Sequence, residues 1–461
     1  MPITRRTLLT AAAATAVTAS AAEKKLNVHG QSSDKDAIEA KSVFPRHEAL
    51  GRGIGAMPGR VTWARNEKAV DWSGDGYWWE LDHFDAKRVR VMLERAVAAL
   101  AGESVPTSIE EPPSLASIRH AWETLFAAHN KVCGRSADYK RGEKIAVKVN
   151  MNGAGAYGDD AAGFTEESYG NAVLMRSLLE ELVEHLGAAP QDIVFYDAGR
   201  IFPKYLMDYV AEGKCKGVQF RHRAPGQALD ARASSIRVHW AGNIRGSASY
   251  LPECVVNAQY LINLANLKGH CYGLTLCGKN HFGSFVNDDR MRAPQAAGLH
   301  GNVASAAHGS YSVLTDLMAN AHLGGKTVLY LLDGLLTATG ESVSLDADSA
   351  RWSMPPFNGG FCASLFASQD PVAIDSVGAD FLMNEPNMTA RNRALAGNAG
   401  VENYLHEAAR AQNPPSDTRY EDGLGHPVTE PLGVHEHWNN VRDKQYGRNL
   451  GKKEGIELVA V

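Results

Sequence analysis

The chain has 461 residues, of which 44% are apolar and 21% are charged, a composition that suits a globular protein with a sizeable core. Its formal net charge is -5 at pH 7. Proteins that bind nucleic acid or anionic membrane surfaces concentrate Lys and Arg. The acidic balance therefore argues against both kinds of partner.

The first 21 residues have the pattern of a twin-arginine signal peptide. Arg5-Arg6 precedes an alanine-rich apolar run over residues 8–17, and Ala19-Ser20-Ala21 forms a small-residue cleavage site. This run is too short and too weakly apolar to span a membrane, and no later stretch meets that requirement either. We therefore expect the twin-arginine export machinery as a partner and an extracytoplasmic, for instance periplasmic, mature protein. Because this route carries folded proteins, a cofactor can be loaded before export.

The rest of the chain divides into four segments by composition and pattern. Residues 22–45 are polar and aperiodic, which predicts a flexible leader. Residues 46–140 predict an irregular N-terminal lobe that is rich in glycine and aromatic residues and carries two helices. Residues 141–385 form the predicted α/β core domain, and residues 386–461 form a C-terminal extension that packs on it.

Within the core domain, short apolar runs alternate with helical patterns. This alternation is typical of an α/β fold with a largely parallel sheet and helices on both of its faces. Ligand sites in such sheets lie beyond the carboxyl ends of the strands, so polar residues at those ends are candidate site residues. The predicted strands are residues 145–149, 193–196, 255–264, 327–332 and 364–367, and the predicted helices are residues 85–100, 115–130, 169–186, 311–321 and 372–383.

Four candidate substrate-binding residues stand at these strand ends. Lys148 and Asn150 are two residues apart and therefore point to one side of their strand. A buried lysine needs a partner or a ligand, although at a strand end its ammonium group can also reach water. Asp197 and Asp333 end two further strands, where a carboxylate either binds a ligand or caps the following turn.

The densest polar stretch lies between residues 263 and 283. Lys268, His270, Lys279, Asn280 and His281 alternate there with glycine and leucine, which supplies donors for an anion and imidazoles for proton transfer. Runs of Lys and His are often only solvated surface, but the interleaved apolar residues predict a wall of the core. We therefore predict His270, Lys279 and His281 as catalytic residues, and Lys268 and Asn280 as further substrate-binding residues.

Sequence motifs for common cofactors and hydrolases are weak or lacking. Gly153 to Gly158 match GxGxxG after a predicted strand, but no helix opens at the last glycine. Asp159 and Asp160 would repel a pyrophosphate, so we do not expect a nucleotide. The six cysteines have neither CxxC nor iron–sulfur spacing, and they form disulfides or stay free. The chain contains no GxSxG, HExxH or P-loop motif.

A metal ion is the one cofactor for which the chain has candidate ligands. His435 and His437 are two residues apart, so in a strand their imidazoles share a face, as metal ligands sometimes do. His270, His281 and Asp333 are the other candidates. No third and fourth ligand accompany the histidine pair in the sequence, so a metal centre and two structural histidines both remain open.

Three segments resemble domain-of-unknown-function family 362 in order and spacing over about residues 140–385. They are Lys144–Asn150, the block from Asn266 to Gly283, and Ser368–Asp375, in which Asp370-Pro371 is typical of a helix start. The aromatic lobe and the ending at residues 435–438 resemble the exported, twin-arginine branch of that family. The resemblance implies an α/β domain. Some relatives carry ferredoxin-type cysteine clusters, which this chain lacks, and the family name implies no reaction.

These residues support three hypotheses about function. The first is an extracytoplasmic enzyme that acts on a small anionic or carbonyl-bearing molecule in a cleft at the strand ends. There, lysines would hold negative charge, a histidine would move protons, and Asn280, Asp197 and Asp333 would orient the ligand or the histidine. The second is a metalloprotein loaded before export. The third is a periplasmic binding protein for an anionic solute.

Replacement of both signal arginines tests the predicted export. The double variant Arg5→Lys/Arg6→Lys lacks the pair that defines this signal, so we expect it to stay in the cytoplasm as uncleaved precursor. Immunoblots of cytoplasmic and periplasmic fractions measure this, with the wild-type chain in the same host as the control. Normal export of the double variant would contradict the assignment.

Overall fold

The computed structural model describes residues 47–136, 138–154, 167–242, 244, 248–287, 299–304, 307–341, 343–392, 394–395 and 400–461. These residues belong to one compact unit, Ala40–Val461. The predicted signal peptide, the predicted leader and most of the GxGxxG loop lie outside the described residues. In the part of the chain that is described, no helix combines the length and the apolar character that a bilayer span requires. The six cysteines all carry free thiols.

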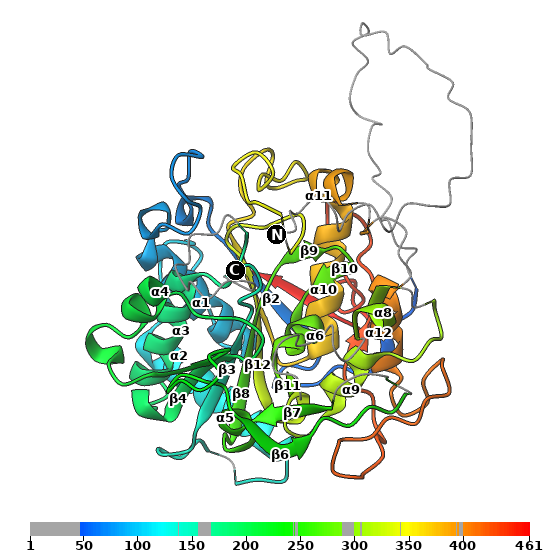
Figure 1. Ribbon diagram of the computed structural model, residues 1–461. Coiled ribbons are helices and arrows are strands. Elements are labelled where there is room, and N and C mark those ends of the chain that lie inside the picture. The colour runs from blue at the N-terminus through cyan, green and yellow to red at the C-terminus, as the bar shows by residue number, and fades with distance from the viewer. Residues whose placement is uncertain are drawn as a thin grey trace, which may run out of the picture. The chain divides into compact units, whose positions relative to one another are not determined.

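A mixed sheet of eight described strands runs through this unit in the order β15-β2-β13-β12-β8-β3-β4-β5 (Figure 1). The five strands from β12 to β5 are parallel, whereas β13 is antiparallel to both of its neighbours. The prediction of an α/β fold with a largely parallel sheet is therefore confirmed. In chain order the strands are β2 (Arg60–Arg65), β3 (Ile145–Val149), β4 (Ile193–Asp197), β5 (Gln219–His222), β8 (Tyr260–Asn266), β12 (Thr327–Gly334), β13 (Ser364–Ser368) and β15 (Glu457–Ala460).

Two strands of this sheet come from outside the predicted core domain. β2 belongs to the predicted N-terminal lobe and pairs with β13, and β15 belongs to the C-terminal extension and pairs with β2. The lobe and the extension therefore extend the central sheet itself. The predicted strand at residues 255–264 begins only at Tyr260, because Glu253–Val256 form the short helix α5.

Helices cover both faces of the sheet, and alternate strand residues point to opposite faces. In β3, Ile145, Val147 and Val149 pack into the core beneath the first group of helices, whereas Ala146 packs into the core on the other face. Lys148 follows Ala146 by two residues and points to that same second face. The first group is α1 (Ala86–Leu100), α2 (Leu115–Val132), α3 (Ala172–Glu184) and α4 (Lys204–Val210); the second includes α6 (Cys277–Asn280), α9 (Val313–Ala319), α10 (Pro371–Asn384) and α12 (Gly400–Ala409).

Short strands and two further helices lie outside the eight-stranded sheet. The short strands form three small antiparallel sheets: β1 with β14, β9 with β10, and β7 between β6 and β11. The strands are β1 (Leu50–Gly51), β6 (Ala233–Arg237), β7 (Ser249–Pro252), β9 (Lys268–His270), β10 (Gly273–Thr275), β11 (Val286–Asn287) and β14 (Val434–His435), and the remaining α-helices are α8 (Leu299–Ala304) and α11 (Pro386–Arg391).

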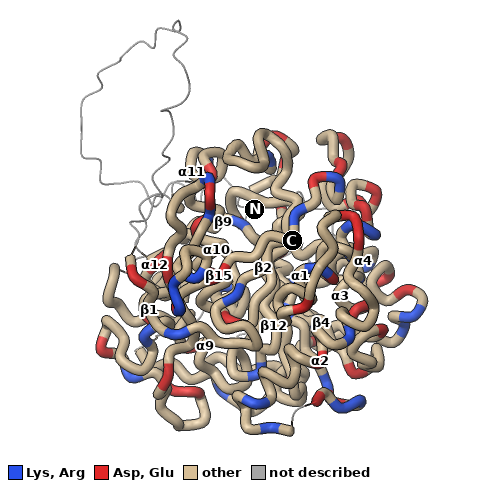
Figure 2. Tube along the Cα trace, turned by 180° about the vertical axis from the view of Figure 1, so that it is seen from behind, with Lys and Arg blue, Asp and Glu red and all other residues tan. Residues whose placement is uncertain are grey.

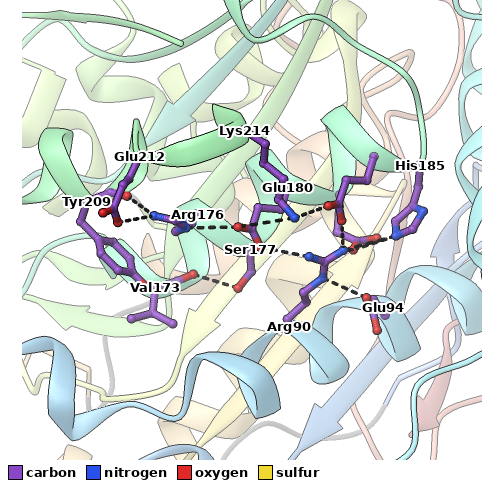
Figure 3. A network of polar contacts seen from close by, with 12 residues as sticks. Arg90, Glu94, Val173, Arg176, Ser177, Glu180, His185, Tyr209, Glu212 and Lys214 are labelled. Carbon is purple, nitrogen blue, oxygen red and sulfur yellow. Dashed lines mark hydrogen bonds and ion pairs between the residues drawn. The ribbon is translucent and has the colours of Figure 1, made fainter. Parts of the chain in front are cut away.

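Ion pairs fasten the helices of the first face to one another (Figure 3). Arg90 of α1 donates to Glu94 on its own helix and to Glu180 on α3, each at 3.0 Å. Arg176 of α3 lies 3.2 Å from Glu180, so this carboxylate joins two arginines. Seen from behind, acidic and basic segments are interspersed along the described chain (Figure 2).

Helix α10 begins as the sequence predicted, with Asp370 as its N-cap and Pro371 in its first turn. The Asp370 carboxylate accepts the N–H groups of Val372 and Ala373 at 3.0 and 2.8 Å. Its second oxygen, Oδ2, accepts two more N–H groups from distant segments, those of Ile54 and Val434, at 3.1 and 3.2 Å. This cap therefore also holds the chain on either side of the β1–β14 pairing.

Removal of this cap tests how much it contributes. An ordinary N-cap is worth about 1 kcal/mol, and each buried N–H group left without a partner costs about 1 to 3 kcal/mol more. We therefore expect Asp370→Ala to lower the free energy of unfolding by about 3 kcal/mol or more. The control is Ser114→Ala, because the exposed Ser114 caps α2 through the N–H of Ser117 alone and should cost about 1 kcal/mol. Equal losses in urea denaturation would contradict the bridging role.

Candidate functional site

A cavity of about 200 Å³ lies beyond the carboxyl ends of β3 and β4, against α6. This is the edge at which the sequence predicted a ligand site. Six of the nine predicted catalytic and substrate-binding residues line this cavity, together with ten further residues. The lining residues are Lys148, Asn150, Asn152, Asp197, Gly199, Arg200, His270, Cys271, Tyr272, Thr275, Lys279, Asn280, Phe282, Gly283, His300 and Glu341.

Lys148 is the polar centre of the cavity floor. Its ammonium group donates to Asp197 Oδ2 at 3.1 Å, to Asn280 Oδ1 at 3.0 Å and to the Val149 carbonyl at 2.6 Å. Burial lowers the pKa of Lys148, whereas the carboxylate of Asp197 raises it again in part. All three protons of the ammonium group are directed at protein acceptors. Lys148 is therefore paired rather than held out to water, which was the alternative reading of the sequence.

Asp197 and Asn280 complete this hydrogen-bond system. Asp197 accepts the N–H groups of Met151 and Gly199 at 3.1 and 2.9 Å, in addition to the lysine. Asn280 donates from Nδ2 to Asn263 Oδ1 at 2.7 Å, which fixes the orientation of its amide. An added Cβ at Gly283 would lie only 2.5 Å from Asp197 Oδ1 and 2.8 Å from Lys148 Nζ. Glycine at this position therefore permits the close approach of the chain to the ion pair.

Lys279 lies in the same cavity but has a different environment. Its Nζ atom lies 3.3 Å from His270 Nε2, 3.2 Å from His300 Nε2 and 3.9 Å from the centre of the Phe282 ring. Among the described residues no carboxylate lies within ion-pair distance of it. Burial lowers the pKa of Lys279 to about 7, and the nearby Glu341 carboxylate only partly opposes this.

The two imidazoles beside Lys279 are uncharged. Burial and the neighbouring lysine lower the pKa of His270 well below its usual range and that of His300 to about 3. His270 Nδ1 accepts the N–H of Tyr272 at 3.1 Å, so the proton of its neutral ring is on Nε2, facing Lys279. His300 Nδ1 is buried and has no hydrogen-bond partner in the described structure.

Three predicted site residues are buried next to the cavity but do not line it. The Lys268 ammonium group donates to the carbonyl groups of Asn152 and Ser168 at 3.2 and 2.6 Å. Asp333 accepts the N–H groups of Asn171 and Leu335, each at 3.1 Å, so it caps turns as the alternative reading of the sequence proposed. His281 lies between Asn263 Nδ2, 3.1 Å from its Nε2, and Ser284 Oγ, 3.0 Å from its Nδ1.

The candidate metal ligands separate into two places. Within the described residues, His270, His281 and Asp333 do not form a group that could share one ion. His270 instead lies near Cys271 and Glu341, with its Nδ1 atom 3.7 Å from Glu341 Oε2. His435 and His437 lie apart from the cavity lining and come together with His47 and Glu402.

Several residues of the cavity were missed by the sequence reasoning. Arg200 follows the end of β4 by only three residues. The search for polar residues at strand ends, which selected Asp197, would have found Arg200 if it had included the loop after the strand. Its guanidinium group donates to Asn152 Oδ1 at 2.9 Å and to the Gly199 carbonyl at 3.0 Å. His300 and Glu341 are isolated in the sequence, and no local pattern marks them.

Because Lys148 and Lys279 have different partners, we expect their replacement to affect the stability of the fold differently. Lys148→Met leaves the buried Asp197 carboxylate without its counter-ion, a loss of about 3 to 5 kcal/mol, so we expect a melting temperature several degrees lower. Lys279→Met leaves no anion without a counter-ion, so we expect a change of at most about 0.5 kcal/mol. The double variant Lys148→Met/Asp197→Asn should lose less than the sum of its single changes. A large loss in Lys279→Met, measured by calorimetry, would mark this lysine as structural.

Comparison with known proteins gives a family but no activity. Neither the curated proteins nor the solved structures include a significant match to the chain. One family model matches residues 145–380, just over half of the chain, and its description is "Domain of unknown function (DUF362)". The matched residues include β3, β4, α6 and most of α10, and with them all the residues that line the cavity. The chain therefore belongs to the DUF362 family, as its sequence motifs had indicated.

Proposed function

We propose that the protein is an exported enzyme that acts on a small anionic molecule with a carbonyl group, bound in the strand-end cavity. The observation that carries the proposal is the environment of Lys279, a buried lysine that lines the cavity and faces two neutral imidazoles. A lysine kept for stability pairs with an acceptor or a carboxylate, as Lys148 and Lys268 do. Lys279 instead presents its nitrogen to the cavity.

The hydrogen-bond pattern supports an uncharged amine on Lys279. Because His270 Nδ1 accepts a backbone N–H, its Nε2 carries the proton and can only donate. A hydrogen bond across the 3.3 Å to Lys279 Nζ therefore requires a lone pair on the lysine nitrogen. A free amine with a pKa near neutrality is a nucleophile toward a carbonyl carbon and forms an imine with loss of water. Both hydrogens of the leaving water come from the amine, and the neutral His270 Nε2–H is placed to donate a hydrogen bond to the oxygen that departs.

Cys271 is a weaker candidate nucleophile in the same cavity. Burial and, after it, the Glu341 carboxylate raise the pKa of its thiol to about 12. The thiolate is the reactive form of cysteine, so this thiol is largely inactive near pH 7. The comparison favours lysine chemistry, and with it a carbonyl substrate.

Size and charge limit the substrate. The cavity of about 200 Å³ is smaller than the pockets of about 300 to 1,000 Å³ that hold drug-sized ligands, so a compact molecule fits best. Arg200, Lys148 and Lys279 line it, against the two carboxylates of Asp197 and Glu341, and one of these is already paired with Lys148. As long as Lys279 carries its proton, this balance favours a negative charge on the ligand. A binding protein for an anion would need the same cations but not an amine that loses its charge near pH 7.

Reductive trapping tests the proposal. With pyruvate as the probe and cyanoborohydride as the reductant, we expect a carboxyethyl group on Lys279 at pH 7.5. Labelling should increase as the pH rises through about 7, because the pKa of Lys279 is lowered to about 7 and only the neutral amine attacks. The exposed Lys204 serves as the comparison site and should be labelled much less at pH 7.5. Peptide mass spectrometry measures both sites in one sample.

Two controls make the test specific. Acetone is similar in size to pyruvate but uncharged, so it should label Lys279 much less if the cavity selects an anion. Lys204→Met should leave the labelling of Lys279 unchanged, whereas Lys279→Met should remove the fast-reacting site. Equal labelling of Lys279 and Lys204 at pH 7.5 would refute the proposal.

A further inference from the structure

A cluster of histidines lies around one buried glutamate, outside the residues that line the cavity. His47, Glu402, His435 and His437 each offer one ligand atom, and these four atoms lie within 4.8 Å of one another. His47 precedes β1, His435 ends β14, with His437 two residues later, and Glu402 is on α12. The antiparallel pairing of β1 with β14, in which Leu50 faces His435, brings the histidines together.

The outer nitrogen of each histidine is bound to a second residue. His47 Nδ1 lies 2.7 Å from the Glu48 carbonyl oxygen, which can only accept a hydrogen bond. His435 Nδ1 lies 2.8 Å from Ser376 Oγ, and that hydroxyl already donates to the Val372 carbonyl at 2.7 Å. Both Nδ1 atoms must therefore carry the hydrogen, which leaves a lone pair on each Nε2 of the neutral rings.

Within the described residues, neither of these lone pairs faces a hydrogen-bond donor. The Nε2 atoms of His47 and His435 are buried, and neither has a hydrogen-bond partner in the described structure. His435 is fully buried, and its Nε2 lies 3.8 Å from Glu402 Oε1, which is too far for a hydrogen bond. A buried polar atom without a partner is destabilising, and an electron-pair acceptor at the centre of the cluster would remove that cost.

His437 completes the pattern. Its Nδ1 lies 2.8 Å from Asp380 Oδ1 on α10, and its Nε2 lies 3.1 Å from Glu402 Oε1. Without a metal ion, an imidazolium at His437 between two carboxylates accounts for these two contacts. It does not account for the lone pairs of His47 and His435. A cation that replaces the Nε2 proton of His437 satisfies all three rings and the glutamate together.

We propose that His47, His435, His437 and Glu402 bind a divalent first-row transition metal ion through three Nε2 atoms and one carboxylate oxygen. Imidazole-rich sites with a carboxylate suit ions such as Zn²⁺ and Fe²⁺. Carbonyl, hydroxyl and carboxylate partners on the outer nitrogens are the arrangement that orients histidine ligands in metal sites. Tetrahedral zinc bonds of about 2.0 to 2.2 Å place ligand atoms about 3.4 Å apart, so any pair near the 4.8 Å limit would have to close in by about 1 Å.

Two more histidines surround the carboxylate rather than the proposed ion. His406 lies one helical turn after Glu402, with its Nε2 3.0 Å from Glu402 Oε1, and His308 Nε2 lies 3.6 Å from Glu402 Oε2. They share the negative charge of Glu402 and hold its side chain toward the other three rings. They are positioning residues in this proposal.

Metal titration of the purified full chain tests the site. After chelation and dialysis, we expect the wild-type protein to bind one equivalent of Zn²⁺ and to melt at a higher temperature with it, because an ion that binds only the folded state stabilises that state. With Co²⁺ as the probe, d–d absorption should appear with the same stoichiometry and report nitrogen and oxygen ligands.

Ligand variants identify the residues. His435→Gln and Glu402→Gln should each lower the Zn²⁺ affinity at least about 100-fold and remove the Co²⁺ spectrum; even loss of a residue that only orients a ligand costs about 10- to 100-fold. The matched control is His222→Gln in β5, a buried histidine whose ring nitrogens also have no hydrogen-bond partner in the described structure. This control should keep wild-type binding. Failure of the wild-type chain to bind Zn²⁺ or Co²⁺, or wild-type affinity in folded His435→Gln, would overturn the proposal.

Discussion

The structure depends on three fully buried aspartates of α10, whose carboxylates accept N–H groups from segments far away in the sequence. A buried amide without a partner costs about 1 to 3 kcal/mol, and a buried carboxylate without donors costs more. Each of these contacts therefore removes two penalties at once. Asp370 accepts the N–H groups of Ile54 and Val434, Asp375 those of Cys277 and Gly278, and Asp380 that of Trp438.

The same helix supports both proposed sites. Asp375 holds the first turn of α6 and thereby orients the part of the chain that carries Lys279 and Asn280 into the cavity. One residue and five residues later, Ser376 and Asp380 hold the outer nitrogens of His435 and His437. Burial raises the pKa of Asp375 to about 6, although its amide donors oppose this shift. One helix thus supplies fixed supporting contacts to the side chains of both proposed sites, as precise sites require.

Much of the fold and half of the site followed from local patterns. Short apolar runs predicted four of the five parallel strands, but not β5, and a helix start predicted α10. The strand-end rule selected Lys148, Asn150 and Asp197, which line one cavity. The rule could not distinguish these from Asp333, because a carboxylate at a strand end caps a turn equally well. Spacing also could not separate His270 from His281. The short α6 turns His281 toward Asn263 and Ser284, and only tertiary packing decides which imidazole faces the cavity.

The proposed metal site shows a different limit of sequence reasoning. His435 and His437 were visible as a pair on one face of a strand, whereas Glu402 and His47 come from segments that only the packing of α12 and β1 brings near. Glu402 and His406, four residues apart on a helix, were a local signal that could have pointed to α12. In both sites the informative feature is a buried polar side chain that lacks the partner expected for it in the described structure. Lys148 and Lys268 have hydrogen-bond acceptors, whereas Lys279 faces two neutral rings. In His435 on β14 and His47 before β1, Nδ1 is hydrogen-bonded, but Nε2 has no donor among the described residues. Folding alone favours satisfied polar groups, so unsatisfied ones that converge on one point are better explained by a ligand than by stability.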